Sequence, residues 1–251
     1  ERIDPATIHH IPWILYHWRK IPGSAAAVVD AKNYAFDAAK RALNEYLERN
    51  GEAGVVGDGL FLGSYRVKRR VDASETVSII IPFRDRMDLL KTCVNSILEK
   101  TSYLKFEILL VDNQSRDDLT RQYLDQLSKV ENIKILHYDY PFNYSAINNF
   151  AVKAAAGRFL LLLNNDMEVI VEEWLSAMVE NIQREEVGVV GAKLIFPNNL
   201  IQHAGVVIGI GEASHAFSHL PETDNGYFGL ASVIRNCSAV TGACLMTRRD
   251  V

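Results

Sequence analysis

The sequence contains little cysteine, and its few cysteines lack the spacing of a metal or redox site. The three residues are Cys93, Cys237 and Cys244, and no Cys-x-x-Cys pair occurs among them. This sparse use of cysteine favours a reduced compartment. His215 and His219 are four residues apart, but no third ligand follows at a recognisable spacing, so we do not expect a zinc site.

Long apolar runs are also missing. The strongest run, residues 159–163, is the size of a strand and far shorter than the roughly 18 residues that span a bilayer. Residues 1–5 do not begin the hydrophobic core of a signal peptide. We therefore expect a cytoplasmic protein, with any membrane association peripheral.

An excess of positive charge and the common nucleotide fingerprints are absent as well. The formal net charge of −4 argues against nucleic acid as a partner. Gly209-Ile210-Gly211 lacks the third glycine of a dinucleotide fingerprint and follows the β-α-β region instead of opening it. No Gly-x4-Gly-Lys-Ser/Thr phosphate loop occurs. The missing fingerprint disfavours an oxidoreductase.

What is present is a chain of 251 residues, 48% hydrophobic, with a polar stretch at residues 71–76 that divides it. We expect residues 1–72 to form an N-terminal appendage and linker, and residues 73–251 to form the main domain. The appendage carries an aromatic segment, 11–18, and a predicted helix, 33–49, which Asn50-Gly51 ends. Because one helix makes a poor core, we expect the appendage to pack on the main domain or on part of a longer protein.

From residue 77 onward, strand and helix patterns alternate. The predicted strands are 77–82, 106–111, 133–138 and 158–163, and the predicted helices are 87–100, 115–127, 145–157 and 172–184. Beyond residue 187 the pattern shifts to strands and loops, with strands expected at 187–196, 205–211 and 238–247. The prediction is an α/β, Rossmann-like open mixed sheet with helices on both faces.

Polar residues follow three of these strands directly. The first strand ends in Pro82-Phe83-Arg84-Asp85, the second in Asp112-Asn113-Gln114-Ser115 and the fourth in Asn164-Asn165-Asp166. In open α/β sheets, ligands bind outside the carboxyl ends of the strands. Carboxylates, amides and hydroxyls at this edge are suited to a nucleotide and a hard cation.

The ordered motifs in residues 141–149, 163–166 and 202–205 carry a family resemblance. Residues 77–251 resemble a family-2 glycosyltransferase with the GT-A fold, of the bacterial polysaccharide branch often labelled rhamnosyltransferase-like. Residues 10–19 resemble the tail of another such domain in tandem proteins. The resemblance therefore implies further domains of a longer chain.

The resemblance also implies roles for the polar residues. Asp166 would anchor Mn²⁺ or Mg²⁺; since Asn164 replaces the first Asp of the familiar Asp-x-Asp pattern, phosphate oxygens and water would complete the coordination shell. His203 and Gly242 would lie on the acceptor or sugar side. The nucleotide-sugar would be bound by Pro82, Arg84, Asp85, Asp112, Asn113, Ser115, Asn143, Ser145, Asn148, Asn164 and Asn165.

Purely structural roles compete with these assignments. Asp112 could accept the imide N–H of uracil or thymine, but Asp-Asn-Gln-Ser is equally suited to a turn and a helix cap. Ser115, with Asp118 three residues on, has the pattern of a capping box, and Ser145 is the expected cap of the following helix. Asn164-Asn165-Asp166 is also a common type of turn.

The implied reaction is inverting transfer of a sugar from a UDP- or dTDP-sugar to a hydroxyl of a glycan or lipid-linked glycan. In the family the catalytic base lies within an acidic motif that does not occur here, so we expect the donor half of a C-terminally truncated domain that lacks its base. Two alternatives stay open: a non-catalytic nucleotide- or glycan-binding module, and a nucleotidyltransferase. The second should have a glycine-rich, basic loop after the first strand, whereas residues 82–86 contain no glycine.

Overall fold

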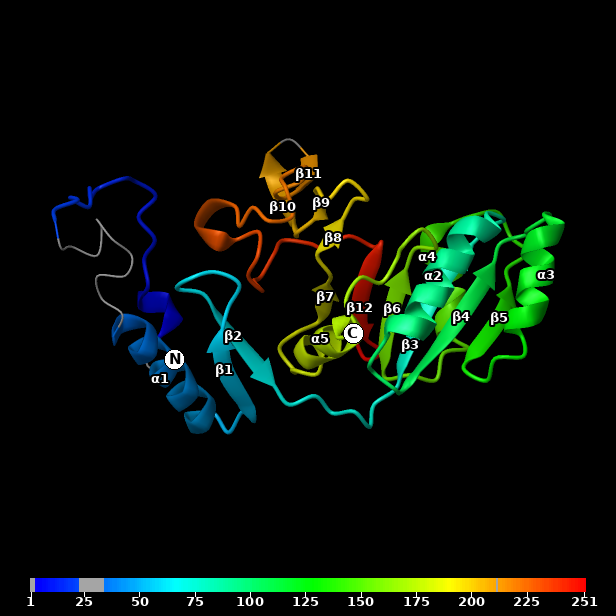
Figure 1. Cartoon of the computed structure of the whole chain (residues 1–251), viewed down its shortest axis with the longest axis horizontal. Coiled ribbons are helices and arrows are strands. Elements are labelled where there is room, and N and C mark those ends of the chain that lie inside the picture. Colours follow the sequence, from blue (N-terminus) through cyan, green and yellow to red (C-terminus); the bar gives the residue numbers. More distant parts are fainter. Residues whose placement is uncertain (1–2, 23–33, 211) are drawn as a thin grey trace. The chain divides into compact units, whose positions relative to one another are not determined.

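The computed structural model describes residues 3–22, 34–210 and 212–251. The chain divides into two compact units, Glu1–Glu52 and Ala53–Val251. Figure 1 shows their secondary structure along the chain. The division falls well before the polar stretch 71–76, where the sequence suggests a boundary.

The first unit contains a 3₁₀ turn, η1 (Pro5–Thr7), and one long helix, α1 (Tyr34–Arg49). Gly51, at φ +65°, ends α1 as expected, because glycine adopts this left-handed conformation without a steric penalty. The N–H of Glu52 donates to the Leu47 carbonyl at 2.9 Å. Residue 33, the predicted start of the helix, lies outside the described residues.

This unit has little core of its own. Among its described residues only Leu47 is buried. In the aromatic segment 11–18, Trp13 is 75% and Trp18 66% exposed. That this segment packs on the main domain or on part of a longer protein stays a prediction from the sequence.

The second unit begins with a hairpin that the sequence patterns did not predict. It pairs β1 (Gly54–Asp58) with β2 (Tyr65–Arg69) in antiparallel register. The guanidinium of Arg66 donates two hydrogen bonds to the carboxylate of Glu180, which lies in α5 (Trp174–Ile182) and is 2% exposed. This ion pair joins the partly exposed Arg66 to a buried carboxylate and ties the hairpin to the rest of the unit, and the structure groups residues 53–70 with the main domain.

A six-stranded mixed sheet organises the unit, in the order β5-β4-β3-β6-β12-β7. Its parallel strands are β3 (Val77–Phe83), β4 (Phe106–Asp112), β5 (Ile133–His137) and β6 (Phe159–Leu163). β12 (Cys244–Arg248) lies antiparallel between β6 and β7 (Val189–Gly191). The predicted mixed sheet is confirmed.

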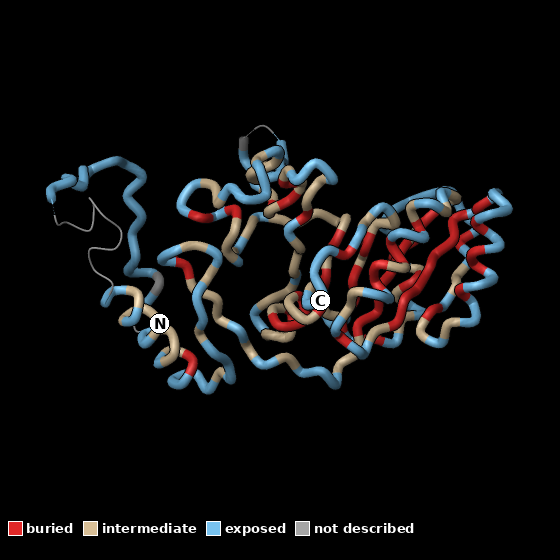
Figure 2. The backbone as a smooth tube through the Cα atoms, viewed as in Figure 1, coloured by how far each residue is buried: buried red, intermediate tan, exposed pale blue. Residues whose placement is uncertain are grey.

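Helices cover both faces of this sheet. Ile79 and Ile81 of β3 belong to a core shared with α2 (Met87–Lys100), α3 (Asp118–Leu127) and α5. Ile80, which points to the opposite face, packs in a second core with α4 (Tyr144–Val152). Burial on both faces explains the continuous apolar strands, and Figure 2 shows the buried backbone concentrated in them.

Several predicted bounds are wrong beyond the parallel strands. The strand expected at 187–196 is split into β7 and β8 (Leu194–Ile195). Short ladders outside the main sheet pair β8 with β9 (Ile201–His203), and β10 (Val206–Ile210) with β11 (Glu212–His215). A 3₁₀ turn, η3 (Tyr227–Gly229), precedes β12.

The helix expected at 145–157 is also shorter, since α4 ends at Val152. The guanidinium of Arg249 donates to the carbonyl oxygens of Val152, Ala155 and Gly157. These tertiary hydrogen bonds satisfy carbonyls at the end of the helix, where partners within the helix run out. Among the described residues, the helices are all too short or too polar to cross a membrane.

Candidate functional site

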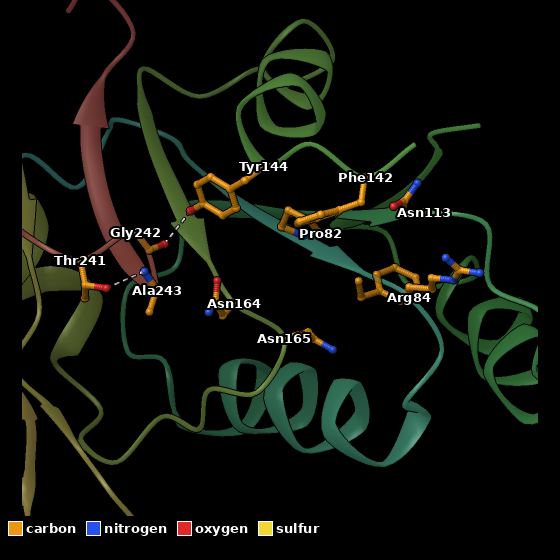
Figure 3. A pocket seen from close by; sticks show the side chains of 11 residues that line it. Pro82, Arg84, Asn113, Phe142, Tyr144, Asn164, Asn165, Thr241, Gly242 and Ala243 are labelled. Atoms are coloured by element: carbon orange, nitrogen blue, oxygen red, sulfur yellow. Dashed lines mark hydrogen bonds between the residues drawn. The ribbon is translucent and has the colours of Figure 1, made fainter. Parts of the chain in front are cut away.

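An open cavity of about 470 Å³ lies where the strand order reverses, outside the carboxyl ends of β3 and β6. This is the switch point where open α/β sheets bind ligands. In Figure 3, Arg84 and Asn113 lie at one end of the cavity, and Thr241, Gly242 and Ala243 at the other. The lining residues are Pro82, Phe83, Arg84, Asn113, Phe142, Tyr144, Asn164, Asn165, Thr241, Gly242 and Ala243.

The turn after β3 is shaped by Asp85. Its carboxylate accepts the backbone N–H groups of Asp117 (2.9 Å) and Arg116 (2.6 Å), and its own N–H donates to Ser115 Oγ at 2.7 Å. The hydrogen bond from Asp117, together with that from Arg116, lowers the pKa of the Asp85 carboxyl. Asp85 therefore joins the turns after β3 and β4, and leaves Arg84 exposed on the cavity wall.

Asp112 has a structural contact of its own. Its Oδ1 accepts the N–H of Ser115 at 2.9 Å, and its Oδ2 lies 3.5 Å from Nδ1 of His137. The side chain is 7% exposed and is not among the cavity-lining residues. The turn role considered for Asp-Asn-Gln-Ser is thus realised, and a direct nucleotide contact by Asp112 stays a prediction.

Asn113 does line the cavity, in a fixed orientation. Its side-chain N–H groups donate to the carbonyl oxygens of Tyr138 (3.0 Å) and Tyr140 (2.8 Å). The amide nitrogen is therefore committed to the chain that leads into α4. The amide oxygen is the atom of Asn113 left to receive a donor from a ligand.

The predicted helix caps at Ser115 and Ser145 are wrong. Asn143 caps α4, with Oδ1 accepting the N–H of Ala146 at 2.9 Å, and Ser145 lies exposed in the first turn. Asp117 caps α3 by accepting the N–H of Thr120. In both cases a residue two positions away from the predicted serine has the extended backbone that an N-cap requires.

Asn148 lies one turn into α4, next to Tyr144. Its side-chain nitrogen donates to the backbone carbonyl of Tyr144 at 2.8 Å. Its Oδ1 is buried and has no hydrogen-bond partner among the described residues. The predicted nucleotide-sugar contact by Asn148 is not tested by this geometry, because Asn148 itself does not line the cavity.

The turn after β6 presents two amides to the cavity. Asn164 and Asn165 both line it, and the backbone N–H of Asn164 donates to the Ala243 carbonyl at 3.0 Å. Asp166 follows, exposed and outside the lining. The order Asn-Asn-Asp thus places the two amides in the cavity lining and the carboxylate outside it.

The far wall of the cavity consists of residues 241–243, which we call the 241–243 wall. Tyr144 Oη donates to the carbonyl of Gly242 at 2.7 Å (Figure 3). A Cβ atom on Gly242 would lie 2.8 Å from Tyr144 Oη, so a larger residue here would have to displace the tyrosine ring. Gly242 was predicted on the sugar side, and here it forms part of the cavity.

His203 does not line the cavity. It is 1% exposed, and its Nε2 faces the N–H groups of Gly205 (3.3 Å) and Thr241 (3.4 Å). Its Nδ1 lies 2.9 Å from Nδ1 of His215. His203 was predicted to lie on the sugar or acceptor side. In the structure it contacts the backbone of the 241–243 wall and not the cavity itself.

Sequence reasoning missed the aromatic and hydroxyl side chains of the site. Phe142 and Tyr144 line the cavity, although only the amides and the serine of their motif were singled out. The available signal was the alternation of aromatic residues at Tyr140, Phe142 and Tyr144, which leads up to the start of α4. For Thr241 no local signal exists, since its place depends on where β12 joins the sheet.

The donor set fits a hard cation only in part. Among the described residues, no group of three or more His, Cys, Asp or Glu side chains could hold a metal ion. Asp166 offers one exposed carboxylate beside the amides of Asn164 and Asn165. This set suits Mg²⁺ or Mn²⁺ when phosphate oxygens and water supply the remaining ligands.

The chain matches a known protein family. A family model described as glycosyl transferase family 2 matches residues 78–251. The chain is 45% identical over its whole length to the uncharacterized protein y4gI of Sinorhizobium fredii, and 46% identical to the O-antigen biosynthesis protein RfbC of Myxococcus xanthus. It spans only 28% and 20% of these two relatives.

Solved structures give weaker likenesses. The mannosyltransferase PcManGT from Pyrobaculum calidifontis, in complex with GDP-Man and Mn²⁺, matches 69% of this chain and 48% of its own, at 17% identity and a TM-score of 0.45. TarS of S. aureus, in complex with UDP-GlcNAc, matches 47% of this chain and 34% of its own, at 25% identity and a TM-score of 0.41.

Proposed function

Because this chain belongs to glycosyl transferase family 2, we propose that it supplies the donor-binding half of an enzyme that moves a sugar from a nucleoside diphosphate sugar to a glycan hydroxyl. Its mixed sheet, with helices on both faces, is the GT-A arrangement. The observation that carries the proposal is the cavity at the switch point, which the predicted residues Arg84, Asn113 and Asn164 line.

The nucleoside would lie at the Arg84 and Asn113 end of the cavity. The exposed ring of Phe142 offers an apolar face for the base. The guanidinium of Arg84 offers charge-assisted hydrogen bonds to phosphate oxygens. Asp112 fixes the turn from which Asn113 projects, and UDP or dTDP is the nucleotide that we propose.

The sugar would then face the 241–243 wall and Asn164. Asp166, with diphosphate oxygens and water, would hold Mn²⁺ or Mg²⁺, and this ion would neutralise charge on the leaving diphosphate. The acceptor hydroxyl, on a glycan or a lipid-linked glycan, would attack the anomeric carbon from the side opposite the diphosphate, which inverts the configuration. The similarity to an O-antigen biosynthesis protein supports bacterial surface polysaccharide as the product.

The proton acceptor has to come from outside the cavity lining. None of the 11 described residues that line it is Asp, Glu or His. We propose that the base belongs to a longer protein, as this chain spans only 28% and 20% of the two relatives that match its whole length. We also propose a cytoplasmic location for the protein. Free thiols are typical of a reduced compartment, and Cys93, Cys237 and Cys244 are all free.

The second candidate is a module that binds nucleotide-sugar without turnover. The lack of a carboxylate in the cavity lining favours it. The two candidates differ in one measurement, the release of nucleotide when the domain is joined to the rest of its chain and given an acceptor. Binding without release under those conditions would support the module.

The first test is calorimetric titration of UDP and dTDP with and without Mn²⁺. We expect Asp166→Ala to remove the metal-dependent part of the affinity and Asp112→Ala to weaken binding with or without metal. Asp125→Ala is the matched control, because Asp125 is an exposed carboxylate of α3 that does not line the cavity. Equal nucleotide affinity with and without metal in the unsubstituted protein would refute the proposed site.

A further inference from the structure

His203 is a buried histidine whose two ring nitrogens both have partners. It ends β9 and is 1% exposed. Nε2 faces two backbone N–H groups, those of Gly205 and Thr241. A nitrogen that faces two donors has to accept, so the ring proton lies on Nδ1, which donates to Nδ1 of His215.

The surroundings keep this imidazole neutral. Burial, His215 and Arg235 lower the pKa of His203 to about 4. The guanidinium of Arg235 lies close by and donates to the carbonyl of Ala204 at 2.8 Å. At neutral pH, Nε2 is therefore available as an acceptor for the Thr241 amide.

The 241–243 wall is held at each of its three residues. The Thr241 N–H points at His203, the Gly242 carbonyl accepts from Tyr144 Oη, and the Ala243 carbonyl accepts from the Asn164 N–H. Tyr144 and Asn164 also line the cavity, whereas His203 does not. His203 thus contacts the wall from outside the cavity.

We propose that His203 is a positioning residue that fixes the 241–243 wall against the sugar half of the donor, and that His215 sets its tautomer. This inference rests on the proposed function for the identity of the ligand. His203 acts through the Thr241 backbone and touches no substrate. The affinity for the sugar depends on it, and the affinity for the nucleotide at the Arg84 end does not.

His215 connects His203 to the neighbouring hairpin of β10 and β11. It lies exposed at the end of β11, opposite Val206 in β10. The N–H of the next residue, Ala216, donates to the Gly205 carbonyl at 2.9 Å. Gly205 has φ +98°, and a Cβ there would lie 2.4 Å from Cys237 Sγ, so a side chain does not fit at this position next to His203.

The first experiment needs no ligand. In ¹⁵N-labelled protein we expect the His203 ring to show the Nδ1–H tautomer, and the Thr241 amide to exchange with solvent at least about tenfold faster in His203→Leu, which leaves that donor unpaired. His203→Gln supplies an amide oxygen as an acceptor and should restore slow exchange. His219→Gln is the matched control, since His219 is exposed and does not line the cavity.

The second experiment uses UDP against UDP-glucose, and dTDP against dTDP-glucose, with Mn²⁺. His203→Leu should weaken the sugar nucleotides about tenfold and the free nucleotides by less than twofold, and His203→Gln should recover most of the loss. Equal weakening of both members of a pair, or unchanged Thr241 exchange in His203→Leu, would overturn the positioning role. If no nucleotide binds to the unsubstituted protein, the proposed function fails, and the exchange data alone decide whether His203 holds the wall.

Discussion

The two ends of the cavity are built in different ways. At the Arg84 end, the Asp112 carboxylate accepts from Ser115, three residues away, and Asp85 accepts from Arg116, 31 residues away. At the 241–243 wall, Tyr144 donates a hydrogen bond to Gly242, which is 98 residues away in the sequence. His203 faces the N–H of Thr241, which is 38 residues away. The first end forms within one β-α-β unit, while the second forms only when β12 enters the sheet.

This difference has a consequence for specificity. A turn that closes within one supersecondary unit keeps its shape as long as its two strands pair. A wall assembled from three distant segments depends on each of them, so substitutions there change how it is placed without unfolding the sheet. We therefore expect the Arg84 end to bind a common nucleotide and the wall to discriminate between sugars.

Acid should weaken the two ends over different pH ranges, with the largest effect at the wall. The pKa of His203 is about 4 in the folded chain, below the ordinary value of 6.5, mainly because of burial. Between these values the unfolded chain binds a proton that the folded chain does not, so stability falls as the pH drops from 6.5 to 4, by about 3 kcal/mol. Asp85 has a lowered pKa, so its contribution is lost only as the pH falls below its ordinary value of 3.8.

The measurement is urea unfolding at several pH values between 7 and 3, compared with the same series for His203→Gln. The variant should lose the slope between pH 6.5 and 4 and keep the change below 3.8. Amide shifts of Thr241 and Asp117 would report the two ends separately. A slope between pH 6.5 and 4 that persists in the variant would assign the titration to another group.

Gly242→Ala should disturb the wall and spare the opposite end. The new Cβ would lie 2.8 Å from Tyr144 Oη, which is closer than real Cβ contacts come. Overpacking of this kind costs about 1–3 kcal/mol of folding stability, and because the wall has to shift to relieve it, we expect the affinity for the sugar nucleotide to fall about tenfold, which is about 1.4 kcal/mol. UDP affinity should stay nearly constant, as titrations of UDP and UDP-glucose would show.

A partner substitution makes this test reciprocal. Tyr144→Phe removes the Oη atom that the new Cβ would meet, and with it the hydrogen bond to the Gly242 carbonyl. The double variant should therefore lose less affinity than the sum of the two single variants. Strict additivity would mean that the two residues do not meet in solution.

The smallest expected effect concerns the N-cap of α4. Asn143→Ala removes the acceptor for the Ala146 N–H and should destabilise the protein by about 1 kcal/mol, whereas Ser145→Ala should change stability little. Chemical denaturation of the two variants measures the difference. A larger loss from Ser145→Ala than from Asn143→Ala would restore the serine as the cap.

Much of the fold could be predicted because its signals are local. The apolar runs of β3, β4 and β6 are buried on both faces of the sheet, as continuous hydrophobic strands in α/β proteins are. Helices between parallel strands follow from the need for a crossover. The hairpin β1–β2 escaped prediction because β1 is mostly exposed, β2 is only partly buried, and the hairpin is fixed by the distant Glu180.

The candidate site could be predicted in outline but not in detail. Arg84, Asn113 and Asn164 line the cavity as expected, since each directly follows a strand. The capping assignments failed because Asn143 and Asp117 compete with the nearby serines for the same backbone donors, and the competition is decided by which residue takes the extended conformation.

By itself the sequence determined the alternation of strands and helices, the polar edge of the sheet and the family resemblance, because these depend on residues close together in the chain. The tertiary structure decided that Tyr144 meets Gly242 and that His203 turns away from the cavity toward Thr241. It did so through the antiparallel insertion of β12 between β6 and β7. The pairing of β12 with β6 and β7 depends on how both faces of the whole sheet are buried. A local sequence pattern does not specify that burial.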